Sequence, residues 1–258
     1  MIPEFLDIRR DIVANKTFQW MPMDTEENYT KVKDLVPYGP NDITYKYNNY
    51  GFRCDDFDSW EKYLYRILFA GCSMTEGIGL PLEDLWTKKL HSMICKELNQ
   101  EIPYWSIASG GTGLDHMTRY LYNLKDLLRP QIIICYIPSS VRRERWHEDR
   151  WSVWSLEREK DTDFLTNEQL VNYQTEKNLV MINLMCEEID AHFLYSRQFE
   201  EYKVENLNLS NFIYKELFIM QLDLARDNMH AGPKSNELFA NTAFEIFWPN
   251  ISEKLGLT

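Results

Sequence analysis

The sequence predicts an α/β protein, a three-layer α/β/α domain with a mostly parallel, doubly wound sheet. Two apolar runs without polar alternation, at 67–70 and 131–137, indicate strands that are covered on both faces. Segments with apolar residues at helical spacing follow these runs, and such alternation is typical of a parallel sheet. With 258 residues and 44% hydrophobic content, the chain can form one sizeable core and an appendage.

The first part of the chain, residues 1–60, is expected to be an N-terminal arm. Turn-forming residues cluster in it, and a strand at 43–47 is followed by a turn at 48–53 that leads into a second short strand. We expect this hairpin to pack on the main domain. A contribution of the arm to substrate binding or to oligomer contacts is the alternative.

The main domain is expected to span residues 61–258. Its strands are predicted at 67–70, 102–108, 131–137 and 191–196, and its helices at 81–94, 114–124, 178–189 and 236–255. Pro81, followed by two acidic residues, suits the first turn of a helix. The apolar segment 217–224 is expected to pack beneath the sheet. An insertion, in part helical, is expected at about 142–175.

Composition excludes several function classes. The net charge of −12 argues against a sequence-independent nucleic-acid binder. No run reaches the roughly 20 apolar residues that a membrane helix needs, and the N-terminus lacks a secretion signal, so we expect a cytoplasmic protein. The five scattered cysteines predict reduced, buried thiols. No metal-ligand spacing and no nucleotide-binding fingerprint occur, so neither a metal nor a cofactor is expected.

A serine follows the first buried strand of the main domain. The run 67–70 ends at Gly71, and Ser73 then lies at the carboxyl end of a parallel strand, where open α/β sheets bind their ligands. This position favours a nucleophile. The alternatives are a helix N-cap role for Ser73 and, less favoured, a thiol nucleophile at Cys72.

An Asp-x-x-His block, Asp227 to His230, lies near the C-terminus and is followed by a Gly-Pro turn. At this spacing the two side chains can face the same way. Asp227 would then fix the tautomer of His230 while His230 takes a proton from a nucleophile. A structural hydrogen bond of His230 is the alternative.

The order of these blocks resembles the SGNH (GDSL-like) hydrolases, over roughly residues 67–233. The resemblance implies a flavodoxin-like fold and a serine esterase that removes an acyl group, with acetyl as the first expectation. It assigns Ser73 as nucleophile, His230 as general base and Asp227 as its orienting partner. The middle residue of the first block is Cys72 in place of the aspartate of the family.

The two inner blocks of the family match less well. The loop 109–113 resembles the glycine block, which implies that the N–H groups of Gly110 and Ser73 stabilise the oxyanion. Where the family has Gly-x-Asn-Asp, this chain has Pro-Ser-Ser, so Ser139 falls at the place of the asparagine donor. Arg142 or Arg143 is the alternative group for stabilising charge.

The insertion provides candidate substrate-binding residues, Arg142 and Trp146, because indole rings near arginines suit a carbohydrate. The alternative is that the tryptophans pack the insertion onto the domain. The expected substrate is a glycan ester or a small-molecule ester, and the oligomeric state stays open. Two rival functions remain: a catalytically weak or inactive glycan-binding module, suggested by the missing asparagine, and a structural protein whose arm makes the contacts.

Overall fold

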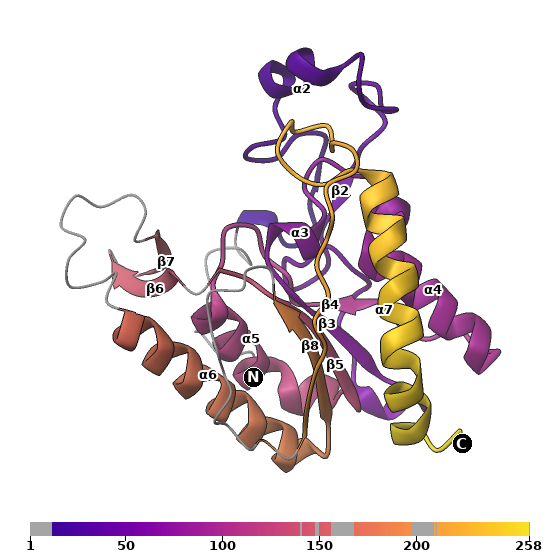
Figure 1. The fold of residues 1–258 in the computed structure, drawn as a ribbon, viewed down its shortest axis with the longest axis vertical. Coiled ribbons are helices and arrows are strands. Elements are labelled where there is room, and N and C mark those ends of the chain that lie inside the picture. Colours follow the sequence, from indigo (N-terminus) through magenta and orange to yellow (C-terminus); the bar gives the residue numbers. More distant parts are fainter. Residues whose placement is uncertain are drawn as a thin grey trace.

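The computed structural model describes residues 12–139, 141–147, 150–155, 168–197, 209 and 211–257. At its centre lies a five-stranded parallel sheet in the order β4-β3-β5-β8-β9 (Figure 1). The strands are β3 (Ile67–Gly71), β4 (Trp105–Ser106), β5 (Ile132–Ile137), β8 (His192–Arg197) and β9 (Phe212–Tyr214). When these five strands are numbered 1 to 5 in chain order, the order in the sheet is 2-1-3-4-5, which is the flavodoxin-like arrangement. The predicted doubly wound sheet is therefore confirmed.

Helices cover both faces of the sheet (Figure 1). On one face, α4 (Trp86–Leu98) packs against α7 (Pro233–Lys254), and on the other α5 (Leu114–Leu128) packs against α6 (Glu168–Ile189). Successive residues of β3 belong to opposite cores, with Phe69 on the α4–α7 side and Leu68 on the α5–α6 side. This two-sided burial explains why the central strands read as continuous apolar runs.

Helix starts differ from the predicted ones by a few residues. Pro81 precedes a 3₁₀ turn, η2 (Leu82–Asp84), and the α-helix begins only at Trp86. The closing helix α7 begins at Pro233, with Gly232 as its N-cap, because proline suits the first helical position. A single short turn of helix, α3 (Ser73–Glu76), follows β3 directly.

The arm contains β1 (Thr17–Phe18), α2 (Glu26–Val32), β2 (Tyr45–Lys46) and η1 (Trp60–Lys62). The strand predicted at 43–47 is present, but its antiparallel partner is β1 and not a strand after the turn. The predicted turn at 48–53 is present, because the Asn48 side chain accepts the N–H groups of Tyr50 and Phe52, each at 2.9 Å. No strand follows this turn before β3, so the predicted hairpin is wrong. Buried tyrosines of the arm join the core of the main domain.

The insertion begins with an antiparallel hairpin of β6 (Arg142–His147) and β7 (Arg150–Ser155). These residues form strands, since the aromatic and β-branched residues Trp151, Val153 and Trp154 of β7 favour a strand. Residues 156–167 lie outside the described part of the chain. Residues 168–175 belong to α6, which begins ten residues earlier than the helix predicted at 178–189.

The segment 217–224 only partly confirms its prediction. Leu217 is buried, but Met220 and Leu222 are 60% and 54% exposed. The Leu222 N–H donates to Ser235 Oγ at 2.9 Å, which ties this segment to the start of α7 and turns its side chains outward. All five cysteines are free thiols, and four of them are buried. None of the helices among the described residues combines the length and apolar character of a membrane span.

Candidate active site

Ser73 lies at the point where the sheet's connections change direction. Strand β3 has β4 on one side and β5 on the other, so the chain leaves it first toward one edge and later crosses to the other. Ligands of open α/β sheets bind outside the carboxyl ends of the strands at such a switch point. Ser73 opens α3 two residues after the end of β3, and its side chain is partly exposed.

The structure brings the three residues of the predicted triad together. His230 Nε2 lies 2.7 Å from Ser73 Oγ, and His230 Nδ1 is hydrogen-bonded to Asp227 Oδ2. With the Nδ1 proton directed at the carboxylate, the Nε2 lone pair faces the serine hydroxyl, which donates to it. Asp227 is fully buried, whereas the His230 side chain is 16% exposed. An imidazole in this setting can remove the proton of the serine.

A tight turn holds Asp227 and His230 in register. The second oxygen of Asp227 accepts the N–H groups of Met229 at 3.1 Å and of His230 at 3.0 Å. Ala225 N–H donates to the His230 carbonyl at 2.9 Å. Asn228 takes the left-handed conformation, with φ of 63°, which asparagine tolerates better than most residues. The spacing Asp-x-x-His therefore follows from one turn that fixes both side chains.

Gly79 marks a close approach between the nucleophile loop, residues 72–80, and this turn. A Cβ atom at Gly79 would lie 2.9 Å from the backbone nitrogen of Asp227 and from Cβ of Ala225. Its φ of 80° also falls in the left-handed region that glycine adopts readily. The two loops can therefore meet only because position 79 has no side chain.

Gly110 lies beside the nucleophile, but its N–H already has an acceptor. A Cβ atom at Gly110 would be 3.7 Å from Cβ of Ser73, which confirms that the glycine loop reaches the serine. The Gly110 N–H donates to Oε2 of Glu76, a carboxylate that is 2% exposed. Oε1 of the same carboxylate accepts the hydroxyl of Tyr47 at 2.8 Å. In this arrangement the hydrogen predicted to face an oxyanion is bonded to Glu76.

The other predicted oxyanion donors are Ser73 and Ser139. The Ser73 N–H belongs to the first turn of α3, so it has no acceptor within its own helix. Ser139 is buried two residues beyond the end of β5, and its carbonyl accepts the Arg142 N–H at 3.3 Å. Ser139 thus starts the turn into the β6–β7 hairpin, and its role as a donor stays a prediction.

The hairpin crosses the start of α5, next to the glycine loop. A Cβ atom at Gly113 would lie 2.2 Å from the carbonyl oxygen of Arg142, so the two backbones are in direct contact. The Glu144 N–H donates to Asp115 at 3.2 Å, and the Glu144 carboxylate pairs with Arg119 of α5. These contacts place Arg142 at the edge of the site without a contact to the triad. Its role toward a substrate stays a prediction.

Of the insertion's tryptophans, Trp151 has a packing role. The guanidinium of Arg119 lies 5.3 Å from the centre of the Trp151 ring, which attaches β7 to α5. Trp146 is the cross-strand neighbour of Trp151, and its side chain lies outside the described part of the structure. The structure therefore supports the packing alternative for Trp151.

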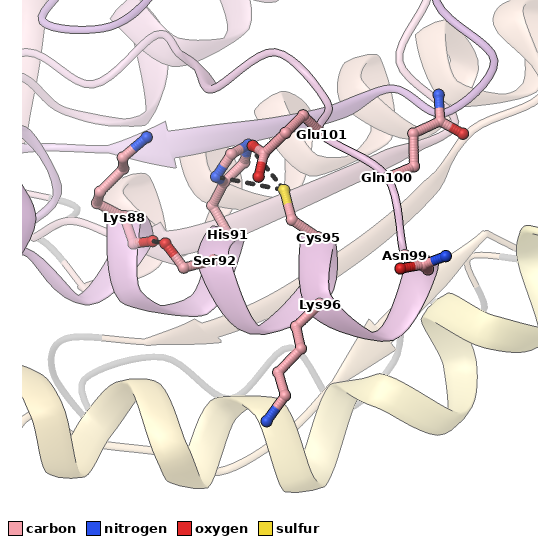
Figure 2. Close-up of a pocket in the computed structure, with 8 residues that line it drawn as sticks. All are labelled: Lys88, His91, Ser92, Cys95, Lys96, Asn99, Gln100 and Glu101. Atoms are coloured by element: carbon pink, nitrogen blue, oxygen red, sulfur yellow. Dashed lines mark hydrogen bonds between the residues drawn. The ribbon is translucent and has the colours of Figure 1, made fainter.

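A separate hollow of about 410 Å³ lies along the C-terminal half of α4 and the loop before β4. Figure 2 shows His91 and Cys95 pointing toward one another in it. It lies toward the amino end of β4, whereas Ser73 follows the carboxyl end of β3. Among the described residues, no group of three or more His, Cys, Asp or Glu is arranged to hold a metal ion.

Glu76 is a residue of the site that its local sequence pattern does not indicate. It ends a Ser-x-x-Glu pattern that begins at Ser73, and this pattern commonly indicates a capping box. In the structure its carboxylate is directed at Gly110 and Tyr47. The local signal was therefore present, but it predicts a partner within the helix, whereas the actual partners come from two other segments.

No protein-family model matches the chain, and no curated protein sequence matches it. Among solved structures, the chain is similar to TesA at 10% identity, with a TM-score of 0.47 over 71% of this chain and 98% of that one. It is similar to the psychrotrophic esterase EstA from Pseudoalteromonas sp. at 14% identity, with a TM-score of 0.46 over 72% and 98% of the two chains. A GDSL-like lipase from Bacteroides thetaiotaomicron is 13% identical, with a TM-score of 0.30 over 73% and 66%. The candidate active site is therefore assigned from the distances between its residues in this structure, and not from these similarities.

Proposed function

We propose that the protein is a serine ester hydrolase in which Ser73 is the nucleophile, His230 the general base and Asp227 the residue that orients it. The observation that supports this proposal is the continuous hydrogen-bonded path from Ser73 Oγ through the imidazole to a buried carboxylate, with 2.7 Å between Oγ and Nε2. Nucleophile, base and orienting group in this order are what acyl transfer by serine requires.

The reaction would proceed in two steps. Ser73 Oγ attacks the carbonyl carbon of the ester while His230 Nε2 accepts the hydroxyl proton. The tetrahedral intermediate then releases the alcohol, which takes that proton from His230, and leaves an acyl-serine. In the second step His230 removes a proton from water as the water oxygen attacks the acyl-serine. The second tetrahedral intermediate then expels the Ser73 oxygen, which takes that proton back from His230, and the carboxylic acid is released. Asp227 stabilises the imidazolium that forms in both steps.

The oxyanion would be stabilised first by the Ser73 N–H, which has no acceptor in its helix. The Gly110 N–H would contribute only after exchanging its bond to Glu76 for a bond to the oxyanion. Ser139 is proposed as a third donor, because it is buried at the same edge of the sheet, after the end of β5. Because the Gly110 N–H must first give up its bond to Glu76, we expect slow turnover.

The proposed substrate is an acyl ester, with acetyl as the first candidate, of a carbohydrate or a small molecule. Supporting this choice, the β6–β7 hairpin that carries Arg142 and Trp146 starts beside the glycine loop, through the contact of the Arg142 backbone with Gly113. Aromatic and guanidinium groups at the rim of a site suit the faces and hydroxyls of a sugar.

The experiment compares Ser73→Ala with the wild type in hydrolysis of nitrophenyl acetate and in labelling by a fluorophosphonate probe. We expect labelling of the wild type at Ser73, and in the variant a loss of both labelling and hydrolysis with a nearly unchanged melting temperature. Equal turnover by the variant would rule out Ser73 as the nucleophile.

A second candidate function is a binding module for a glycan on the same fold. It is favoured by one specific observation, the occupation of the Gly110 N–H by the Glu76 carboxylate, which leaves the oxyanion site incomplete. A wild type that binds an acetylated glycan in calorimetry but neither hydrolyses it nor reacts with the fluorophosphonate would support this candidate over the esterase.

A further inference from the structure

The arm and the triad turn are joined by an ion pair with no solvent exposure. Asp24 of the arm and Arg226 are both 0% exposed, and Arg226 Nη2 lies 2.6 Å from Asp24 Oδ2. The guanidinium also donates to the carbonyls of Gln19 at 2.6 Å and Pro40 at 2.9 Å, and it lies 4.0 Å from the Trp20 ring centre. Arg226 is thus held by four residues of the arm.

Arg226 is the residue directly before the triad's aspartate. Its side chain is directed into the arm, whereas its backbone N–H donates to the carbonyl of Gly79 at 2.9 Å. Gly79 is also where the nucleophile loop contacts Asp227. Fixing Arg226 therefore fixes the start of the turn that carries Asp227 and His230 against the loop that carries Ser73.

The arm holds the nucleophile loop through two further residues. The Gly79 N–H donates to the hydroxyl of Tyr45 at 2.7 Å, and this hydroxyl donates to Asp24 at 2.5 Å. Burial, together with the Asp24 carboxylate, raises the pKa of Tyr45, so its hydroxyl keeps its proton. Arg53 donates to the carbonyls of Gly77 at 2.6 Å and Leu80 at 2.8 Å, and its guanidinium lies 4.4 Å from the Tyr45 ring centre.

These four residues, Asp24, Tyr45, Arg53 and Arg226, are called the arm clamp below. Burying charged groups is unfavourable, and apolar residues of similar size often give equal or higher stability. A cluster of buried charged and polar side chains makes directional hydrogen bonds to particular backbone groups. An apolar cluster cannot make such bonds. In the arm clamp those backbone groups are the Gly79 N–H and the Gly77 and Leu80 carbonyls of the nucleophile loop. The arrangement therefore fits a role in setting geometry.

We propose that the arm clamp is a set of positioning residues that keeps Ser73 and His230 at reacting distance, so that the N-terminal arm is part of the catalytic unit. This inference rests on the proposed esterase function. Reacting groups must be held closely, since a misplacement of about 1 Å lowers a rate by roughly 10²-fold. The clamp joins the two loops on which the Ser73–His230 distance depends.

The experiment compares Tyr45→Phe with a matched control, Tyr104→Phe. Both tyrosines are almost fully buried, and each hydroxyl makes a short buried hydrogen bond, to Asp24 at 2.5 Å and to Thr87 at 2.6 Å. Only Tyr45 contacts the nucleophile loop. A general loss of stability should therefore appear in both variants. A loss of the positioning of the nucleophile loop should appear only in Tyr45→Phe.

Three quantities are measured: the melting temperature, kcat and KM for nitrophenyl acetate, and hydrogen exchange of the Met229 and His230 amides. These two amides donate to Asp227, so they report the turn without any substrate. We expect similar decreases in melting temperature for both variants. In Tyr45→Phe alone we expect kcat to fall about 10-fold at unchanged KM and the two amides to exchange faster.

The inference is overturned if Tyr45→Phe and Tyr104→Phe share the same kcat and the same exchange of the two amides. Ser73→Ala, measured in the same series, separates this outcome from failure of the proposed function. An active Ser73→Ala contradicts the esterase function itself. An inactive Ser73→Ala beside a fully active Tyr45→Phe with an unchanged turn contradicts only the arm clamp.

Discussion

Ser73 Oγ and His230 Nε2 lie 2.7 Å apart, although 157 positions separate the two residues in the chain. The serine is placed by the end of β3 and the histidine by the turn before α7. Local structure around either residue does not bring the two together. Their meeting depends on the sheet order, which brings the carboxyl end of β3 to the switch point, and on the contact between the two loops at Gly79.

Replacing Asp227 by asparagine should abolish most activity without unfolding the turn. The asparagine oxygen can still accept the N–H groups of Met229 and His230, but its amide group no longer favours the Nδ1–H tautomer of His230. We expect kcat to fall by about 10³- to 10⁴-fold. Asp227→Ala is the control, because it removes both effects and should in addition lower the melting temperature. An Asn variant with wild-type kcat would show that the carboxylate has no role in catalysis.

Neutralising Glu76 should raise the rate. Its carboxylate competes for the Gly110 N–H and puts a buried negative charge close to the place where the oxyanion would form. Glu76→Gln keeps the size of the side chain, so we expect kcat to increase by about 3- to 10-fold and stability to fall by about 1 kcal/mol.

Tyr47→Phe is the control for Glu76, since it removes the bond to the other carboxylate oxygen and keeps the charge. It should not raise kcat. A Gln variant whose kcat falls while its melting temperature is unchanged would indicate that the carboxylate holds the glycine loop in its active form.

Adding one methyl group at Gly113 should displace the hairpin. An alanine Cβ would lie 2.2 Å from the Arg142 carbonyl, and neither backbone can move freely, so we expect a loss of about 3 kcal/mol in denaturant unfolding. Gly111→Ala is the matched control. There a Cβ meets nothing within 4 Å, and only the φ of 76° is unfavourable, which costs about 1–2 kcal/mol. The Glu144 amide should lose its exchange protection in Gly113→Ala only. A larger loss in Gly111→Ala would contradict the contact.

Stability should depend on pH through His91, which lines the hollow shown in Figure 2. Burial, together with the nearby Lys88, lowers the pKa of His91 below its ordinary 6.5. Below pH 6.5 the unfolded chain therefore binds a proton that the folded chain does not, and stability falls as the pH falls toward the folded-state pKa.

Urea unfolding of the wild type and His91→Gln, at pH 7.5 and at several values below 6.5, measures this effect. Glutamine can still donate to the Ile102 carbonyl, to which the ring nitrogen lies at 3.0 Å. The variant should lose less stability on acidification. Identical pH dependence in the two proteins would show that His91 is not the group responsible.

Local patterns were sufficient to predict the sheet and the triad blocks, because each is encoded within a few adjacent residues. The apolar runs of β3 and β5 and the Asp-x-x-His turn are of this kind. β9 was missed, because three residues, Phe212–Tyr214, are too short to stand out from their polar surroundings.

Contacts between distant segments could not be predicted in this way. Nothing in the neighbourhood of Asp24 indicates that its partner is Arg226, 202 positions later. The bond of Glu76 to Gly110 likewise depends on how two loops meet, so the sequence analysis assigned the glycine N–H to the oxyanion alone. The pairing of β2 with β1 shows the same limit, since Tyr45 and its partner Phe18 lie 27 positions apart in the chain.

The distance in sequence between Asp24 and Arg226 also bears on biosynthesis. Asp24 leaves the ribosome long before Arg226 has been translated, and a carboxylate without a counter-charge is not buried in the meantime. A nascent polypeptide whose Ser73 has already emerged would therefore keep Asp24 solvated, and the arm clamp would form only when translation is nearly complete.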